Sequence, residues 1–251
     1  MLTLRNPFAI VGMMLLSFLA AGCASVKNES ADEILAKAAK AADPNEVMKN
    51  IKTMVLTSKV VAPNGFPGRL VIRMKFPDMI RIEEETADDT TIKVFNGVKG
   101  WEFTTMTGYR ELWGKELDRL KFQAVFHISP NNNLKDVFAQ AVVDGEKTIG
   151  DFDCHRLIGD PLAVYKVPPV TLYIDKRTYM LVKTEQAHNT LQGKREISML
   201  FNDYKSVEGV MMPRSITSTI DFRTLKINVE SVMWNEEIDA SKFNPPATLL
   251  K

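Results

Sequence analysis

Alternation of apolar and polar residues along most of the chain is the feature that most restricts its fold. The clearest run is 69–76, in which Leu70, Ile72, Met74 and Phe76 alternate with mostly charged neighbours. Successive side chains of a strand point to opposite faces, so this run predicts a strand with one apolar face and one solvated face. The same period returns in many segments between residues 53 and 104 and between residues 147 and 233. The sequence therefore predicts a mainly β (α+β) protein built on one antiparallel sheet of about 11 strands.

Turn-forming pairs separate the predicted strands at short intervals, among them Asn96-Gly97, Thr107-Gly108 and Glu208-Gly209. Short turns of this kind join neighbouring antiparallel strands. A twisted sheet of this many strands is expected to curl. Because few helical segments accompany so many strands, the helices can cover only one face. We therefore expect a curved sheet, or open half-barrel, covered by a few helices and enclosing a hydrophobic cavity.

Helical spacing is confined to a few segments. Ser30 followed by Glu33 forms a capping-box sequence, which predicts a helix starting there. The pair Asp43-Pro44 predicts a second helix start. Gly114 to His127 predicts a third helix, with Leu117, Leu120, Ala124 and Ile128 on one side. A further helical stripe is formed by Leu134, Val137, Phe138 and Ala141.

The first 22 residues have the three parts of a secretory signal peptide. Arg5 gives a short positive start, the segment from Phe8 to Ala21 is apolar, and small residues precede Cys23. The apolar segment is too short to favour a membrane-spanning helix of about 20 residues. A cysteine directly after small residues resembles the lipobox, at which the thiol is acylated and the chain is cut before it. The alternatives are an ordinary cleaved signal with an incidental cysteine, and an uncleaved N-terminal anchor.

The expected organisation has three parts. Residues 1–22 are predicted to be a lipoprotein signal peptide, and residues 23–29 the lipidated Cys23 with a short tether. Residues 30–251 are predicted to form one half-barrel domain, since all-β domains often reach this size and bury a sizeable core.

Charge and cysteine content argue against a nucleic-acid-binding protein and against a scaffold held together by disulfides. The chain has 32 basic and 31 acidic residues, and removal of Arg5 with the signal peptide makes the two equal in number. That balance gives no electrostatic reason to expect a nucleic acid as partner. Only two cysteines are present, so once Cys23 carries lipid, Cys154 has no partner for a disulfide. We expect Cys154 to be a small buried apolar residue.

No pattern in the sequence indicates catalysis, a metal or a cofactor. The histidines, His127, His155 and His188, lie in separate segments. Cys154 and His155 are neighbours on a predicted strand, so their side chains point to opposite faces and do not form a nucleophilic pair. The sequence contains no GxSxG, HExxH or phosphate-binding glycine loop. We expect a protein that is not an enzyme and binds no metal or cofactor; an enzyme using Cys154 or these histidines is the weakest hypothesis.

The candidate cavity residues are large apolar residues that we assign to one face of the predicted sheet. They are Leu70, Ile72, Met74, Phe76, Ile80, Ile82, Trp101, Phe103, Met199 and Phe201. Methionine and aromatic side chains suit an adaptable apolar site, and each methylene of a buried acyl chain contributes about 0.8 kcal/mol. The alternative is that these residues form only the ordinary core between sheet and helices.

Phe66 is a second candidate, because it lies at the tip of a predicted hairpin, residues 64–68. An exposed ring there would contact a membrane or a partner protein. The alternative is a ring folded back onto the domain.

Several stretches carry a family resemblance. They are residues 95–101 with the following Thr-Gly turn and the helix 116–125, residues 172–175 with 178–181, Tyr204 with Gly209, Val210 and Pro213, and residues 234–235 with 238–245. These stretches resemble the outer-membrane lipoprotein-sorting proteins, the LolA/LolB-like superfamily, which also includes the RseB/MucB-type stress sensors. The resemblance implies an eleven-stranded half-barrel closed by helices around a hydrophobic cavity that binds acyl chains non-covalently.

The function implied by this resemblance is binding of the acyl chains of lipoproteins or lipids, in outer-membrane lipoprotein sorting or lipid transport. The periplasmic carrier of the family is soluble, whereas this chain has its own lipidation signal at Cys23 and so resembles a lipid-anchored member. In the family's sorting rule, an aspartate after the lipidated cysteine retains a lipoprotein in the inner membrane. Ala24 at that position implies the periplasmic face of the outer membrane. The alternative is an envelope sensor or adaptor that binds a protein partner, as the RseB/MucB-type relatives do.

Overall fold

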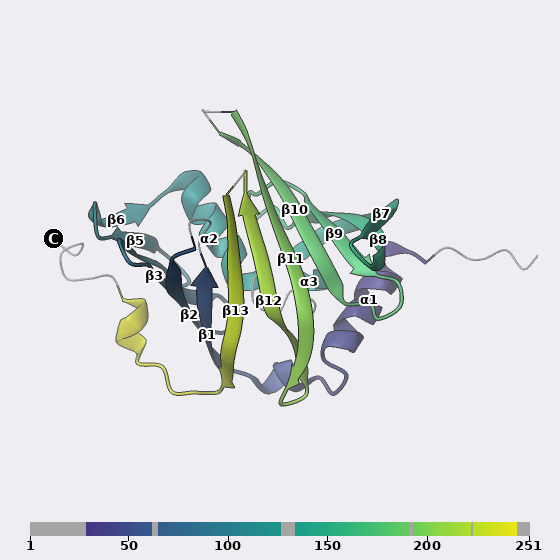
Figure 1. Ribbon diagram of the computed structural model, residues 1–251, viewed down its shortest axis with the longest axis horizontal. Helices are drawn as coiled ribbons and strands as arrows, with labels where there is room; N and C mark the ends of the chain where they lie inside the picture. The colour runs from purple at the N-terminus through teal and green to yellow at the C-terminus, as the bar shows by residue number, and fades with distance from the viewer. Residues whose placement is uncertain (1–28, 62–64, 127–133, 191–192, 222, 245–251) are drawn as a thin grey trace, which may run out of the picture.

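The computed structural model describes residues 29–61, 65–126, 134–190, 193–221 and 223–244 (Figure 1). For residues 188–190 and 193–194 only the backbone is described. The predicted signal peptide and Cys23 lie outside the described residues.

Thirteen strands in the described part of the chain form one antiparallel sheet. Their bounds are β1 (Thr53–Val61), β2 (Pro67–Lys75), β3 (Met79–Glu85), β4 (Thr90–Phe95), β5 (Gly100–Thr104), β6 (Gly108–Leu112), β7 (Phe138–Ile149), β8 (Phe152–Pro161), β9 (Val170–Asp175), β10 (Leu181–Thr190), β11 (Gly193–Val207), β12 (Val210–Ile220) and β13 (Arg223–Trp234). The spatial order is β6-β5-β4-β3-β2-β1-β13-β12-β11-β10-β9-β8-β7. The predicted open half-barrel is confirmed, with more strands than the 11 or so expected.

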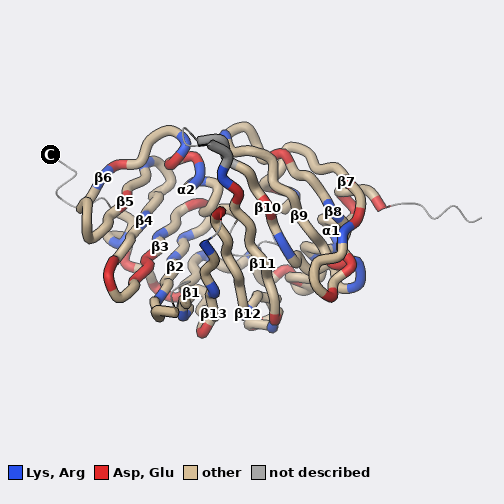
Figure 2. Tube along the Cα trace, turned by 45° about the horizontal axis from the view of Figure 1, so that its top comes forward, with Lys and Arg blue, Asp and Glu red and all other residues tan. Residues whose placement is uncertain are grey.

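The strand order explains why a helix lies across the open side of the sheet. Each half of the chain forms a meander, and the two meanders join where β1 pairs with β13, for example at Met54 and Trp234. The sheet therefore ends at β6 and β7, which are consecutive strands in the chain. The segment between them must cross from one edge of the sheet to the other, and it contains α2 (Gly114–Phe126) and α3 (Leu134–Val137). Figure 2 shows the resulting arc of strands, with both signs of charge interspersed along it.

The N-terminal helix α1 (Ala31–Ala42) begins as the sequence predicts. The Glu33 amide donates to Ser30 Oγ at 3.2 Å, and the Ser30 amide donates to Glu33 Oε2 at 2.8 Å, which completes the capping box. The second predicted helix is wrong in extent, because only a short 3₁₀ helix, η1 (Val47–Asn50), follows. Glu46 has a left-handed backbone with φ 56°, so no helix continues from Pro44.

The predicted helix through Phe138 and Ala141 is also wrong. Helix α3 ends at Val137, and Phe138 begins β7, where it pairs with Pro161 of β8. Strand β7 is an edge strand with most of its side chains exposed. It therefore lacks the alternation that marks a half-buried strand, and its apolar residues are spaced like those of a helix.

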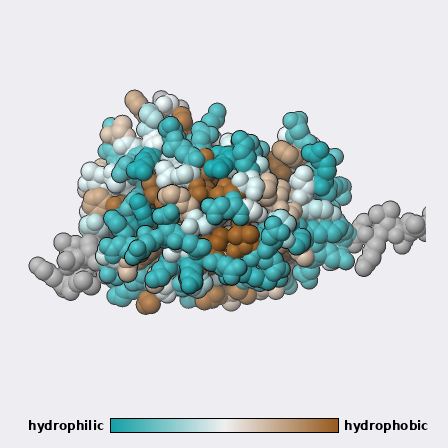
Figure 3. Space-filling view, turned by 90° about the horizontal axis from the view of Figure 1, so that it is seen from below, coloured by the Kyte–Doolittle hydropathy of each residue, from teal (hydrophilic) through white to brown (hydrophobic). Residues whose placement is uncertain are grey.

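Two apolar clusters lie between the helices and the inner face of the sheet. One contains Ile34 and Leu35 of α1 with Leu172 of β9. The other contains Leu120 of α2 with Met54 and Ile80. The face seen in Figure 3 is mainly hydrophilic, with apolar side chains gathered near its centre.

Close packing of α2 on the sheet depends on a glycine in β5. A Cβ atom at Gly100 would lie 2.7 Å from Leu117 Cδ1 and 3.5 Å from Leu120 Cδ2. Both leucines lie on α2, so the absence of a side chain at Gly100 lets this helix approach the sheet closely.

Candidate functional site

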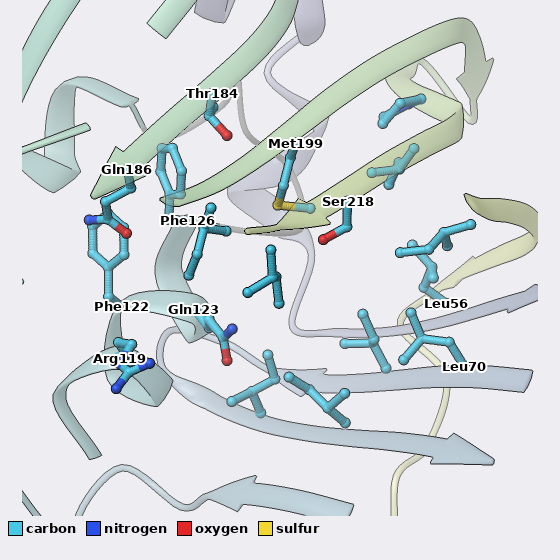
Figure 4. Close-up of a pocket in the computed structure, with 18 of the residues that line it drawn as sticks. Leu56, Leu70, Arg119, Phe122, Gln123, Phe126, Thr184, Gln186, Met199 and Ser218 are labelled. Atoms are coloured by element: carbon cyan, nitrogen blue, oxygen red, sulfur yellow. The ribbon is translucent and has the colours of Figure 1, made fainter. Parts of the chain in front are cut away.

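An apolar cavity of about 220 Å³ lies between the inner face of the sheet and α2 (Figure 4). Its walls come from both meanders of the sheet. The sheet residues that line it are Leu56, Leu70, Ile72, Ile80, Ile82, Val170, Thr184, Gln186, Ile197, Met199, Met212, Pro213, Ile216, Ser218, Ile220 and Ile227. Helix α2 adds Arg119, Phe122, Gln123 and Phe126. A site lined so largely by aliphatic and aromatic side chains is suited to an apolar ligand.

Aromatic packing holds the cavity side of α2 in position. Phe122 and Phe126 are one turn apart, and their rings stack with centroids 4.9 Å apart. Phe122 also meets the edge of Tyr165 at 5.7 Å, and Phe126 meets the edge of Phe138 at 5.9 Å. Such ring pairs contribute about 0.5–1.5 kcal/mol each beyond the burial of their surface. They fix the helix over the cavity at the end near β7.

The polar groups of the lining are few. The Gln186 side chain donates from Nε2 to the Pro168 carbonyl at 2.7 Å. Thr184 is buried, and Ser218 is half-buried. Arg119 Nε donates to the Lys115 carbonyl at 3.4 Å, a long contact within α2. Among the described residues that line the cavity, none is a histidine, cysteine, aspartate or glutamate.

Five of the ten candidate cavity residues line this cavity: Leu70, Ile72, Ile80, Ile82 and Met199. All five are aliphatic residues or methionine from β2, β3 and β11.

Three other candidates lie in the core around the cavity. Met74 and Phe201 are each only 2% exposed and belong to the two inner clusters. Phe76 is partly buried against the same cluster as Met74. These side chains share the inner clusters with lining residues but do not themselves line the cavity.

Trp101 and Phe103 lie on the opposite face of the sheet, so their assignment to the cavity is wrong. Ile80 lines the cavity, so the next residue of β3, Arg81, points to the outer face. Residues paired across neighbouring strands share a face. Arg81 pairs with Val94 of β4, and Val94 pairs with Trp101 of β5, so Trp101 also points outward. Trp101 packs there against Val94 and Phe243 of the C-terminal 3₁₀ helix η2 (Ala240–Phe243). The alternation predicted for β5 was correct, but its apolar side faces outward, where Phe243 of η2 covers Trp101.

Phe103 shares this outer face and packs on Tyr109 of β6, with ring centroids 4.7 Å apart. Phe66, directly before β2, is 55% exposed.

Cys154 is fully buried in an outer cluster with Tyr173 and Val182. Burial, with the nearby charges of Asp175 and Asp153, raises the pKa of its thiol to about 11. A thiol with this pKa stays protonated at neutral pH and is unreactive.

His155 faces the other way from Cys154. Its Nε2 lies 3.5 Å from Glu29 Oε2, and its ring stacks on Tyr179 with centroids 6.2 Å apart. Burial lowers the pKa of His155 below its ordinary value. Across the described residues, no three His, Cys, Asp or Glu side chains lie close enough together to hold a metal ion.

The sequence pattern did not predict the residues that α2 contributes to the cavity. Leu117, Leu120 and Ala124 of the predicted stripe do pack against the core, and Ile128 lies outside the described residues. The cavity side is the neighbouring stripe, with Phe122 and Phe126. Two phenylalanines four residues apart could have signalled it, since such a pair shares one side of a helix.

An open antiparallel half-barrel with a helix across its open side and an apolar cavity beneath defines the LolA-like fold, and solved structures share it. A LolA superfamily protein from Nitrosomonas europaea is 14% identical, with a TM-score of 0.56 over 87% of this chain and 99% of that chain. A DUF1329 family protein from Desulfovibrio piger is 10% identical, with a TM-score of 0.55 over 89% of this chain and 100% of that chain. A domain from Vibrio parahaemolyticus that is described as an outer membrane lipoprotein-sorting protein domain is 12% identical. Its TM-score is 0.53 over 84% of this chain and 94% of that chain.

At these identities the likeness concerns the fold. No protein-family model and no curated protein matches the chain. Among the helices that the structure describes, none is both long and apolar enough to cross a membrane.

Proposed function

We propose that this protein is a lipid-anchored protein of the bacterial envelope that binds acyl chains non-covalently, in outer-membrane lipoprotein sorting or lipid transport. The observation that carries the proposal is the apolar cavity between α2 and the sheet. Fifteen of its twenty lining residues are apolar, which suits the chain of an amphiphile better than a wholly polar metabolite. An acyl chain needs no more than such walls, because burial of each methylene contributes about 0.8 kcal/mol.

The size of the cavity sets how much of a chain it can hold. Pockets for drug-sized ligands measure about 300–1,000 Å³, so a cavity of about 220 Å³ accommodates part of a long acyl chain. The rest of a longer chain would extend beyond the cavity.

Two further features support a position at a membrane. Cys23 precedes the α1 N-cap, Ser30, by seven residues, so a tether of ~3.4 Å per residue keeps the domain within about 24 Å of an acylated cysteine. Phe66 offers an exposed apolar residue at a hairpin, and its burial in a membrane would be favourable.

A pair of variants on β12 tests the cavity. Ser218 lines the cavity, whereas its neighbour Thr217 points to the outer face. Ser218→Phe should fill the cavity and reduce binding of a fluorescent fatty acid by at least tenfold. Thr217→Phe adds the same ring outside and should leave binding unchanged. Native mass spectrometry of the purified protein should also show a bound lipid. Equal binding by both variants, or no binding by the unaltered protein, contradicts the proposal.

The anchor is tested separately by labelling cells with an alkyne analogue of palmitate. The unaltered protein should incorporate the label and fractionate with the outer membrane, and Cys23→Ser should not. Label on Cys23→Ser, or none on either protein, contradicts lipidation at Cys23. If no lipid binds the cavity and an envelope protein is captured only when Phe66 is present, the sensor or adaptor hypothesis takes the place of the carrier.

A further inference from the structure

Arg119 is the one charged side chain that lines the cavity within the described part of the chain. It lies on α2 and is half-buried. Figure 4 shows it beside Phe122 and Gln123, at the side of the view opposite Leu56 and Leu70. The cavity is therefore asymmetric, since a cation lies at one end and the opposite end is aliphatic.

Among the described residues the guanidinium of Arg119 forms no ion pair within 4 Å of a carboxylate, although its charge helps to lower the pKa of Glu116, three residues earlier on α2. Arg73 and Arg81 pair with Glu83, and Arg110 pairs with Glu116 through two hydrogen bonds of 2.8 and 3.0 Å. Arg119 makes only the 3.4 Å contact from Nε to the Lys115 carbonyl. Its terminal nitrogens donate no hydrogen bond to any other described residue.

A half-buried guanidinium that no carboxylate contacts directly is unfavourable, because apolar walls replace part of its water. An oxyanion removes that penalty and can accept two parallel hydrogen bonds from the guanidinium. Gln123 lies four residues further along α2 and lines the same cavity. Side chains four residues apart share one side of a helix, so the Gln123 amide can donate to the same oxyanion.

We infer that the cavity selects amphiphiles with an anionic head group, a carboxylate or a phosphate, which Arg119 binds while the acyl chain extends between α2 and the sheet. This inference rests on the proposed binding of acyl chains and names the class of ligand. The acylated end of a lipoprotein carries esters and an amide but no anion beside its chains. Recognition by Arg119 therefore favours a fatty acid or a phospholipid over a lipoprotein as the cargo.

Matched ligand pairs test this inference on the purified protein. Each ligand competes with a fluorescent fatty acid in the cavity. Palmitate and hexadecanol share one chain length and differ in the carboxylate. Lysophosphatidate and monoacylglycerol differ in the phosphate. A triacylated cysteinyl lipopeptide represents the lipoprotein end. The variants are Arg119→Gln, Arg119→Lys and Lys121→Gln, the last removing a positive charge from α2 at a position that does not line the cavity.

We expect an anion to bind about tenfold more tightly than its neutral counterpart, the effect of one charge-assisted hydrogen-bonded pair. The preference for palmitate or for lysophosphatidate identifies the head group. Arg119→Gln should abolish the preference yet bind hexadecanol normally, which also shows that it folds. Arg119→Lys should keep part of the preference, and Lys121→Gln all of it.

Equal binding of both members of each pair, or a preference that survives Arg119→Gln, overturns the head-group inference while leaving acyl binding intact. Tighter binding of the lipopeptide than of either anion overturns it in favour of a lipoprotein carrier. Failure of every ligand to bind overturns the proposed function itself.

Discussion

Gly159 of β8 lies against the ring of Phe138, and this contact permits a quantitative prediction. A Cβ atom at Gly159 would lie 2.8 Å from Phe138 Cδ1 and 2.9 Å from both Cε1 and Cγ. Carbon atoms pack best at about 3.5–4.0 Å, so the ring would have to retreat by roughly 0.7 Å or more. Phe138 is only 6% exposed and meets Phe126 edge-on at 5.9 Å, which leaves it little room. Gly159→Ala should therefore lower the free energy of unfolding by about 1–3 kcal/mol, the usual effect of overpacking.

Urea unfolding followed by circular dichroism measures this change. The control is Phe138→Leu, which removes the ring that the new methyl group would strike. Alone, Phe138→Leu should be destabilising, because it leaves a gap in the core. Combined with Gly159→Ala, it should cost less than the sum of the two single changes, with a coupling of about 0.5–3 kcal/mol. An unchanged urea midpoint for Gly159→Ala, or strict additivity of the pair, would refute the packing argument.

Three other predictions concern single side chains. Because the pKa of Cys154 is raised to about 11, the native protein should resist iodoacetamide at pH 8 and react fully once unfolded; rapid native alkylation would contradict its burial. Phe66→Ser should weaken partition of the non-acylated protein into anionic vesicles about five- to tenfold, without change in urea midpoint, since half of a phenylalanine is available for burial. Burial lowers the pKa of His155 below 6.5, so the unfolded chain takes up this proton first and stability falls as pH drops below about 6.5. His155→Gln should make that fall less steep in urea titrations, and an identical slope would argue against the assignment.

Local patterns predicted much of the fold. Alternation along 69–76 and the Asn96-Gly97 turn predicted the half-buried strands and hairpins, since both depend on near neighbours in the chain. The capping box of Ser30 and Glu33 was predicted for the same reason. Prediction failed at β7, because an exposed edge strand has no buried face to impose a period on its sequence.

The candidate site was predicted only in part. The cavity residues of β2 and β3 could be found, because both strands have one apolar face and it is the inner one. Trp101 was misplaced because its strand has its apolar residues on the outer face, under Phe243. Nothing within residues 100–104 signals that cover, which comes from a segment far along the chain.

The sequence by itself determined the strand-rich class and the hairpin order, because each depends on the identities of adjacent residues. Only the tertiary structure decided which face of the sheet encloses a cavity, that α2 covers it, and that Arg119 lines it. These properties depend on the pairing of β1 with β13 and on the path of the chain from β6 to β7. Both bring together residues whose separation in the sequence gives no local sign of their contact.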